Sequence, residues 1–418
     1  MTERMPRLTS AQTASRLGVK VESLYAYVSR GLLVSTRAED GGSTFDPLAV
    51  EELAERRRRG APRGSGGRMS GRPIMVLDSA LALIDGDELY LRGISVRELA
   101  HTHTFEQAVR FLWRDGAAPT IPDDTEQAGE RFTSTRETVT AIRRAERALG
   151  TRRRLIDQLV LAVTIAASME SGRTVLDAAS VQDAGRRMMA TMVDSLIDQG
   201  AAAPRTAPLA ERLWPKLSAR TPSSGELRLL DSAMVLGIEH DLAISTMAAR
   251  VAASARADPY LAITAALSAF DGASHGAASV KAVELVEETI RTGNAEHALA
   301  RSIAATGVIP GFGHVLYRRE DPRARFLLDA MGRLPTFREA VRAADTLSSV
   351  VALRAPRPVN LDLALATFVV GAGLRREAGE LVFAVSRTAG WVAHIIDEYA
   401  QPALRLRPES RYTGPATA

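Results

Sequence analysis

Glycine, histidine and arginine occur close together in the stretch from Gly311 to Arg323. Gly311 and Gly313 flank a phenylalanine, His314 follows directly, and an Asp-Pro-Arg turn ends at Arg323. A glycine pair lets the backbone approach a ligand closely, and an Asp-Pro turn fixes the guanidinium that follows it. Imidazole can polarise a carbonyl, and guanidinium binds carboxylates. The stretch therefore predicts a site for an anion that carries a polarisable carbonyl.

Further residues able to do chemistry lie before and after this stretch. They are His240 in Glu-His-Asp-Leu-Ala, His275 in Ser-His-Gly-Ala-Ala, Asp362 in Val-Asn-Leu-Asp and Arg387 in Ser-Arg-Thr-Ala-Gly-Trp. Each of them alone has an ordinary explanation as a core, surface or helix-capping residue. Together, in this order and rough spacing, the five motifs resemble the citrate synthases. The resemblance extends from Leu77 to Gly414.

This resemblance implies an enzyme that condenses acetyl-CoA or propionyl-CoA with oxaloacetate, giving citrate or 2-methylcitrate and CoA, with no cofactor. It also implies that Asp362 removes the proton next to the thioester, His275 donates a hydrogen bond to the thioester oxygen, and His314 polarises the ketone. A carboxylate with an ordinary pKa of about 3.9 is a weak base for this proton, so the enolate oxygen must be stabilised. A methyl difference is worth only about 1–3 kcal/mol in an apolar pocket, so both acyl groups stay open.

The same resemblance assigns residues that hold the substrates. Oxaloacetate has two carboxylates, which planar guanidinium groups can grip at two points. His240, Arg323 and Arg387 match the substrate-holding positions, and Arg318 matches a position that meets CoA phosphate in some members. Arg407, in Arg-Pro-x-x-x-Tyr-x-Gly, matches an arginine that reaches into the neighbouring subunit's site. The expected assembly is therefore a homodimer.

An apolar stripe on the long helix expected before the tail also favours a dimer. It consists of Leu381, Val385, Val392 and Ile396. These residues recur at helical spacing and are suited to burial.

Several positions depart from the residues usual in the family. Ala243 replaces Asn, Ala277 and Ser279 replace Gly and Asn, and Val315 replaces Arg. These changes remove polar groups around the expected site and spare the residues assigned to the chemistry.

The front of the chain predicts a small basic module. Ser10 is expected to cap a short helix, residues 21–30 to form a second helix, Asp40-Gly41-Gly42 to turn a hairpin, and Asp46-Pro47 to begin a third helix. The Tyr-x-x-x-Gly-Leu-Leu pattern from Tyr27 to Leu33 resembles the winged helix-turn-helix of the MerR group.

That second resemblance implies DNA binding. The second helix would enter the major groove with Lys20, Ser23, Tyr27 and Arg30, and Arg37 in the wing would meet phosphate. Residues 1–73 hold 13 Lys+Arg against 8 Asp+Glu in a chain of net charge +4, so the excess positive charge lies in the segment that is expected to bind DNA. The alternative is an interaction module with no affinity for DNA.

Two functions from different classes remain open. One is the enzyme with an attached DNA-binding or regulatory segment. The other is a transcription regulator whose synthase-like body senses an acyl-CoA or a dicarboxylate. The front segment favours the regulator, whereas the intact His275, His314 and Asp362 favour the enzyme, which we prefer.

Composition limits the classes of protein. The chain has 418 residues, 46% of them hydrophobic, and can bury a sizeable core in two or three domains. The absence of cysteine excludes disulfides, thiolate metal sites and cysteine nucleophiles. No apolar run follows the first arginines as in a signal peptide, and Leu363–Leu374 is too short to cross a membrane. We expect a cytoplasmic protein with no membrane partner; no metal site is expected, and His101 and His103 are expected at the surface.

The pattern of apolar residues predicts an all-α fold. Helical spacing recurs beyond Thr135, and no alternation of strands and helices is present. We expect a helix-turn-helix domain over 1–58, an Arg/Gly-rich linker over 59–76, a large domain over 77–275 and 373–418, and a small domain over 276–372. Because the linker composition predicts flexibility, removing the front segment is expected to leave catalysis intact.

Overall fold

The computed structural model describes residues 5–38, 41–60, 76–114, 131–150, 154–272, 278–411 and 413–414. His275 and Ala277 lie outside these ranges, as does most of the expected linker. The described part is mostly helical, with two small three-stranded sheets. None of its helices has both the length and the apolar character needed to cross a lipid bilayer.

The front segment contains three helices and a small sheet. Its elements are β1 (Leu8–Thr9), α1 (Ser10–Leu17), α2 (Ser23–Ser29), β2 (Ser35–Arg37), β3 (Ser43–Phe45) and α3 (Pro47–Gly60). The strands pair antiparallel in the order β1-β3-β2. Asp46 accepts from the Leu48 N–H at 3.0 Å, as expected for the start of α3. The cap of α1 is Thr9 rather than Ser10, because Thr9 and Gln12 form a reciprocal capping box.

The rest of the chain begins with a second sheet. Strands β4 (Ala82–Asp85), β5 (Glu88–Leu91) and β6 (Ile94–Ser95) form a meander. Strands β4 and β5 form a hairpin, with Asp85 opposite Glu88. The Arg92-Gly93 turn between β5 and β6 has positive φ at both residues, which suits a two-residue hairpin turn.

Most helices pack around the last one, α18 (Ala378–Tyr399), which contacts α5, α7, α8, α10, α11 and α12. The other members of this group are α4 (Val96–Thr102), α5 (Phe105–Trp113), α6 (Arg136–Leu149), α7 (Leu155–Met169), α8 (Ala178–Ser195), α9 (Leu209–Leu217), α10 (Ser224–Gly237), α11 (Ile244–Ser254) and α12 (Pro259–Phe270). Leu381, Val385 and Val392 are fully buried inside this group and Ile396 is partly buried. The apolar stripe thus packs within its own chain. The prediction that it favours a dimer was wrong.

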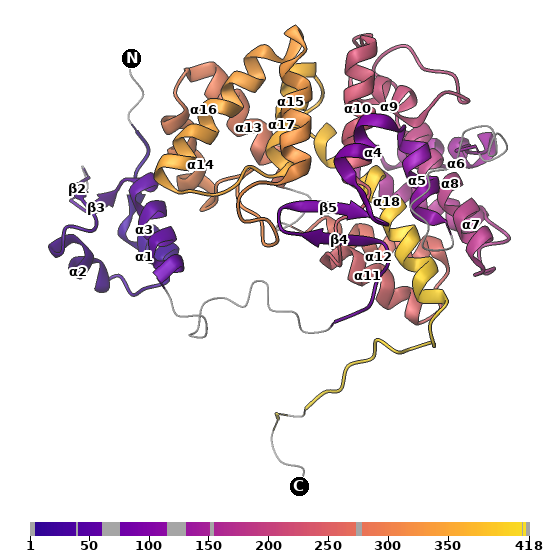
Figure 1. Cartoon of the computed structure of the whole chain (residues 1–418), viewed down its shortest axis with the longest axis horizontal. Coiled ribbons are helices and arrows are strands. Elements are labelled where there is room, and N and C mark those ends of the chain that lie inside the picture. Colours follow the sequence, from indigo (N-terminus) through magenta and orange to yellow (C-terminus); the bar gives the residue numbers. More distant parts are fainter. Residues whose placement is uncertain are drawn as a thin grey trace.

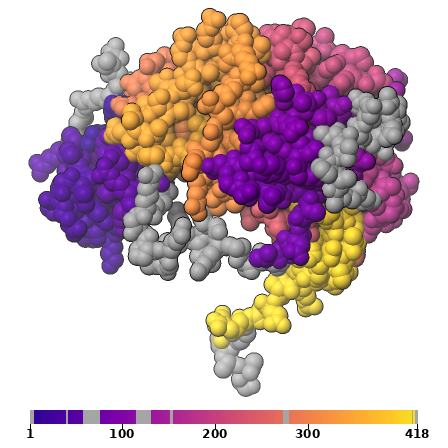
Figure 2. All heavy atoms as spheres, in the orientation of Figure 1, coloured from indigo at the N-terminus to yellow at the C-terminus, as the bar shows by residue number. Residues whose placement is uncertain are grey.

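A second group of helices carries the motif stretch. It comprises α13 (Ala278–Thr292), α14 (Ala295–Thr306), α15 (Pro322–Gly332), the 3-10 helix η2 (Pro335–Phe337), α16 (Arg338–Arg354) and α17 (Leu361–Ala372), which pack on one another. They appear in orange tones in Figure 1, beside the group around α18. The indigo front segment lies against them in Figures 1 and 2, with α3 contacting α14 and α16.

Candidate active site

The Gly311–His314 turn is pinned to the start of α17 by backbone pairing. The Gly313 N–H donates to Pro358 O at 2.7 Å, and the Asn360 N–H donates to Gly311 O at 3.0 Å. Asn360 Nδ2 also donates to Gly313 O at 3.1 Å. A Cβ at Gly311 would lie 2.7 Å from Leu363 Cβ, and the φ of 81° is left-handed. Only glycine therefore permits this close approach.

Two predicted histidines and a tyrosine meet beside this turn. The His240 and His314 rings lie 4.8 Å apart, edge to face. His240 Nε2 lies 2.9 Å from the hydroxyl of Tyr317, which is buried. Tyr317 was not predicted as a site residue, although it stands only three residues after His314. Its contact with His240 joins residues 77 positions apart, so it depends on packing that local spacing does not show.

Both histidines are held neutral. Burial, helped by the Arg323 charge, lowers the pKa of His314 to about 4. Burial and the same arginine also hold the pKa of His240 well below its ordinary value. His314 Nδ1 accepts from the Leu316 N–H at 3.0 Å, which assigns the ring proton to Nε2. His314 can therefore donate a neutral hydrogen bond to a substrate oxygen.

Two buried arginines complete a positive wall. Arg323 donates through Nε and Nη2 to Asp321 at 3.0 and 2.8 Å, and its guanidinium lies over the Tyr317 ring. Arg387 donates through Nε to Gly237 O at 3.0 Å. Its buried Nη2 has no hydrogen-bond partner among the described residues. A buried charged donor without a partner costs free energy, so this geometry favours the binding of an anion at Arg387.

The lowered pKa of Arg387 also favours anion binding at this residue. Burial lowers its pKa to about 10, and Glu239 counters only part of this effect. Glu239 is itself fully buried, and one of its oxygens lies 3.3 Å from His394 Nε2. Glu239 and His394 were not predicted as site residues, and their roles depend on contacts between α18 and the end of α10 that the sequence does not show.

Asp362 occupies the first turn of α17 beside this wall. Asn360 caps the helix by accepting from the Asp362 N–H at 3.0 Å, so the Asp362 carboxylate is not needed as the cap. Burial raises its pKa to about 6, and Arg323 opposes the rise. A carboxylate with a raised pKa is a stronger base at neutral pH.

The remaining predicted positions lie elsewhere. Arg318 is exposed, and its backbone N–H donates at 2.9 Å to Asp87 in the β4–β5 turn. Arg407 is exposed on the tail, which runs away from the body in Figure 1. The structure thus brings together His240, His314, Arg323, Asp362 and Arg387, but not Arg318 or Arg407. His275 falls outside the described residues.

In the front segment, three of the five predicted DNA contacts are accessible. Lys20, Arg30 and Arg37 are exposed and Ser23 is partly buried. Tyr27 packs partly against the core, with Arg57 over its ring at 5.6 Å. Tyr27 therefore has a structural role in the fold of this segment.

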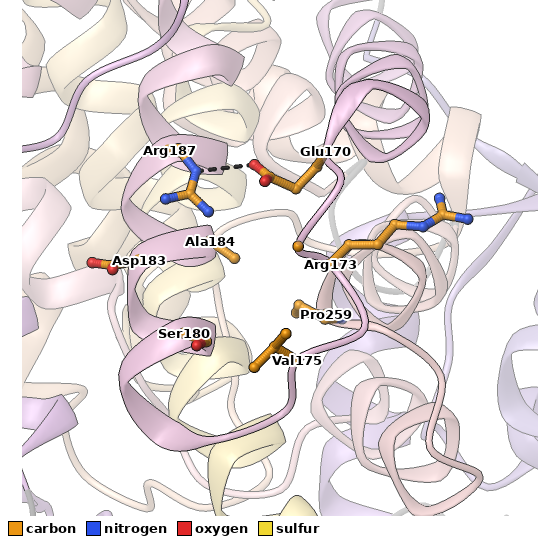
Figure 3. A pocket seen from close by; sticks show the side chains of 9 residues that line it. Glu170, Arg173, Val175, Ser180, Asp183, Ala184, Arg187 and Pro259 are labelled. Carbon is orange, nitrogen blue, oxygen red and sulfur yellow. Dashed lines mark hydrogen bonds and ion pairs between the residues drawn. The ribbon is translucent and has the colours of Figure 1, made fainter.

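A separate hollow of about 150 Å³ lies between the α7–α8 loop, α8 and the start of α12 (Figure 3). Its lining contains none of the predicted site residues. Arg187 and Glu170 form an ion pair across it at 3.1 Å, and Arg173 is 3.5 Å from Asp258. The charges around this hollow are balanced by these pairs.

These features define a mostly helical protein with a buried basic site at the meeting of two helical groups. Residues 70–409 match the family profile described as citrate synthase, C-terminal domain. A 2-methylcitrate synthase from Mycobacterium tuberculosis is 30% identical over 350 residues, which cover 78% of this chain and 85% of that protein. The chain belongs to the citrate synthase family.

Other similarities agree with this assignment. Citrate synthase 2 from Bacillus subtilis is 33% identical over 50% of this chain, a match that spans only 56% of that relative. The crystal structure of citrate synthase from Thermotoga maritima has a TM-score of 0.66 at 26% identity, covering 82% of this chain and 95% of that one. The Thermoplasma acidophilum citrate synthase, solved as a ternary complex with carboxymethyl coenzyme A and oxaloacetate, has a TM-score of 0.68 at 23% identity and supports the fold alone.

Proposed function

We propose that the protein is a citrate or 2-methylcitrate synthase, condensing acetyl-CoA or propionyl-CoA with oxaloacetate. The observation that carries this proposal is Arg387, a buried guanidinium with an unpartnered Nη2 among the described residues, next to Arg323 and two neutral histidines. A small dicarboxylate with a ketone supplies what this site lacks. Its carboxylates meet the guanidinium groups, and its ketone oxygen accepts from His314 Nε2.

The reaction follows from these positions. The Asp362 carboxylate takes a proton from the carbon next to the thioester, while His275 donates to the thioester oxygen that gains charge. The new carbon nucleophile attacks the oxaloacetate ketone, whose oxygen is polarised by His314. Water then cleaves the thioester and releases CoA as a free thiol. The reaction uses no cofactor, and Arg318 contacts CoA phosphate.

Replacing Arg387 by methionine tests the carrying observation. We expect oxaloacetate affinity, measured by calorimetry, to fall about 10- to 100-fold, because a hydrogen bond to a charged group is worth about 1.5–3 kcal/mol. Arg387→Lys should recover part of the affinity. Arg342→Met, which removes an exposed arginine from the middle of α16, is the matched control. Equal affinity in wild type and Arg387→Met would remove Arg387 from the substrate site.

The assembly belongs to the same proposal. We assign the group around α18 to a large domain and α13–α17 to a small domain, working in the cytoplasm as a homodimer. Ile244 and Val251 on α11 and Leu261 on α12 are exposed apolar side chains on neighbouring helices, and they support a dimer contact there. Arg407, exposed on a tail that leaves the body, can then reach the partner's site.

A second candidate function is duplex DNA binding by the front segment, as a MerR-like winged helix-turn-helix. Two observations favour it. α1 and α2 are joined by a short turn after Gly18 and followed by the β2–β3 hairpin, and Lys20, Arg30 and Arg37 are exposed on this part. Helix α2 would lie in the major groove and the hairpin on the flanking phosphates.

Exposed arginines on this surface should carry the DNA affinity. We expect Arg30→Ala and Arg37→Ala to weaken binding to genomic fragments. Each should also reduce, by about 1, the steepness with which the logarithm of the binding constant falls with the logarithm of the salt concentration. Arg291→Ala in α13 removes the same charge elsewhere and should change neither quantity. If wild type retains no fragment at low salt, the segment is an interaction module and not a DNA-binding domain.

A further inference from the structure

The front segment meets the synthase body through a buried ion pair. Glu51 of α3 is fully buried. Its Oε2 accepts from Arg16 Nη2 of α1 at 2.7 Å and from Arg357 Nη2 at 2.8 Å. Arg357 belongs to the short segment between α16 and α17, so one carboxylate joins two parts of the chain. A buried charge clasped in this way is costly to leave unpaired, which fixes the contact strongly.

A second, more exposed set of ion pairs lies beside it. Arg357 also reaches Glu55 at 3.4 Å. At the end of α16, Arg354 reaches Asp46 at 3.2 Å and Glu52 at 3.8 Å. Acidic residues of the front segment thus form ion pairs with both Arg354, at the end of α16, and Arg357, in the segment between α16 and α17. In Figures 1 and 2 the indigo segment lies beside the orange helices.

The segment held by Glu51 is the one that positions the catalytic groups. Pro358, the residue after Arg357, accepts the 2.7 Å hydrogen bond from Gly313, which precedes His314. The Arg357 Cδ lies 3.5 Å from where a Cβ on Gly313 would stand, so the arginine stem packs on the turn. Two residues after Pro358, Asn360 caps helix α17, whose first turn holds Asp362. From Glu51 to Gly313 the path is one ion pair, one peptide unit and one hydrogen bond, and His314 is the next residue.

We propose that Arg357 is a positioning residue for His314 and Asp362, and that Glu51 of the front segment holds it in place. The front segment is then a working part of the synthase site. This replaces the expectation that the segment can be removed without effect on catalysis. The proposal rests on the proposed function, because it concerns the geometry of that site.

The test compares Arg357→Met with two matched variants of the full chain. We expect Arg357→Met to lower kcat about 10- to 100-fold, as small misplacements of catalytic groups do, with a smaller change in KM for oxaloacetate. Arg357→Lys should restore part of kcat. Arg354→Met also removes an arginine that pairs with the front segment, but it lies outside the hydrogen bonds to Gly313, and should stay within about twofold of wild type. Glu51→Gln and Arg357→Met should not be additive.

A readout independent of turnover separates this proposal from the proposed function. In histidine-labelled protein, the His314 ring signals, assigned with His314→Gln, should shift in Arg357→Met and not in Arg354→Met. Absence of thiol release by wild type would contradict the proposed function, while the His314 signals would still decide whether Arg357 positions the ring. Unchanged His314 signals in Arg357→Met, or wild-type kcat in that variant, would overturn the positioning role.

Discussion

Replacing Asp362 by asparagine should lower the rate of condensation about 10²- to 10⁴-fold, the usual cost of removing a general base. The amide keeps the size of the side chain but cannot take the proton next to the thioester. Oxaloacetate affinity should change little, because Arg323, Arg387 and His240 hold that substrate. The measurement is kcat from thiol release, with oxaloacetate affinity from calorimetry on the same preparation.

Folding provides the control for this variant. The pKa of Asp362 is raised from 3.8 to about 6 by burial, so ionisation of this carboxylate destabilises the fold as the pH rises through that interval, and the loss is complete above it. Asparagine removes this buried charge, and the variant should unfold at the same temperature as wild type or at a higher one at pH 8. Near-normal turnover by a folded Asp362→Asn would exclude Asp362 as the base.

The same raised pKa sets the pH dependence of the wild-type rate. The base must be deprotonated to act, so kcat/KM should fall as the pH drops through about 6. His314, with its pKa lowered to about 4, stays neutral over this range and contributes no fall of its own. A rate that stays constant down to pH 5 would contradict the assignment.

Mixing two inactive variants should restore activity if the site is shared between subunits. We expect Asp362→Ala and Arg407→Ala each to be nearly inactive alone. In a mixed dimer one site collects both lesions, and the other joins an intact Asp362 to an intact Arg407 from the partner. With random exchange half of the dimers are mixed and each has one good site, so roughly a quarter of wild-type activity returns.

Subunit exchange must be confirmed by mass in the mixed sample. Arg407→Ala mixed with wild type should keep about half of wild-type activity with or without exchange, so it checks that the exchange procedure itself does not inactivate the protein. If exchange is complete and Asp362→Ala with Arg407→Ala stays inactive, then Arg407 acts in its own chain. The exposed position of Arg407 on the tail agrees with the shared arrangement.

Most of the residues that come together at the site could be predicted from the sequence, because each stands in a motif of fixed local spacing. Gly311, Gly313 and His314 are neighbours along the chain, so their joint role needs no knowledge of distant packing. The start of α3 at Pro47 was predictable for the same reason, since Asp46 and Pro47 form a local cap.

Contacts between distant segments could not be predicted in this way. The orphaned Nη2 of Arg387 depends on how α18 packs against the end of α10, and the clasp of Glu51 depends on how α3 lies on α16. The stripe at Leu381 shows the same limit, because apolar spacing reveals that a face is buried but not which partner covers it. The sequence likewise could not show that Tyr317 would meet His240.

The most direct measurement of the central claim is release of free thiol when purified protein meets oxaloacetate and an acyl-CoA. Acetyl-CoA and propionyl-CoA should be tried separately, with Asp362→Asn as the inactive control. The account predicts oxaloacetate-dependent thiol release with at least one of them, and formation of citrate or 2-methylcitrate in equal amount. Binding of oxaloacetate without thiol release from either acyl-CoA would contradict it and would favour a sensor built on the synthase fold.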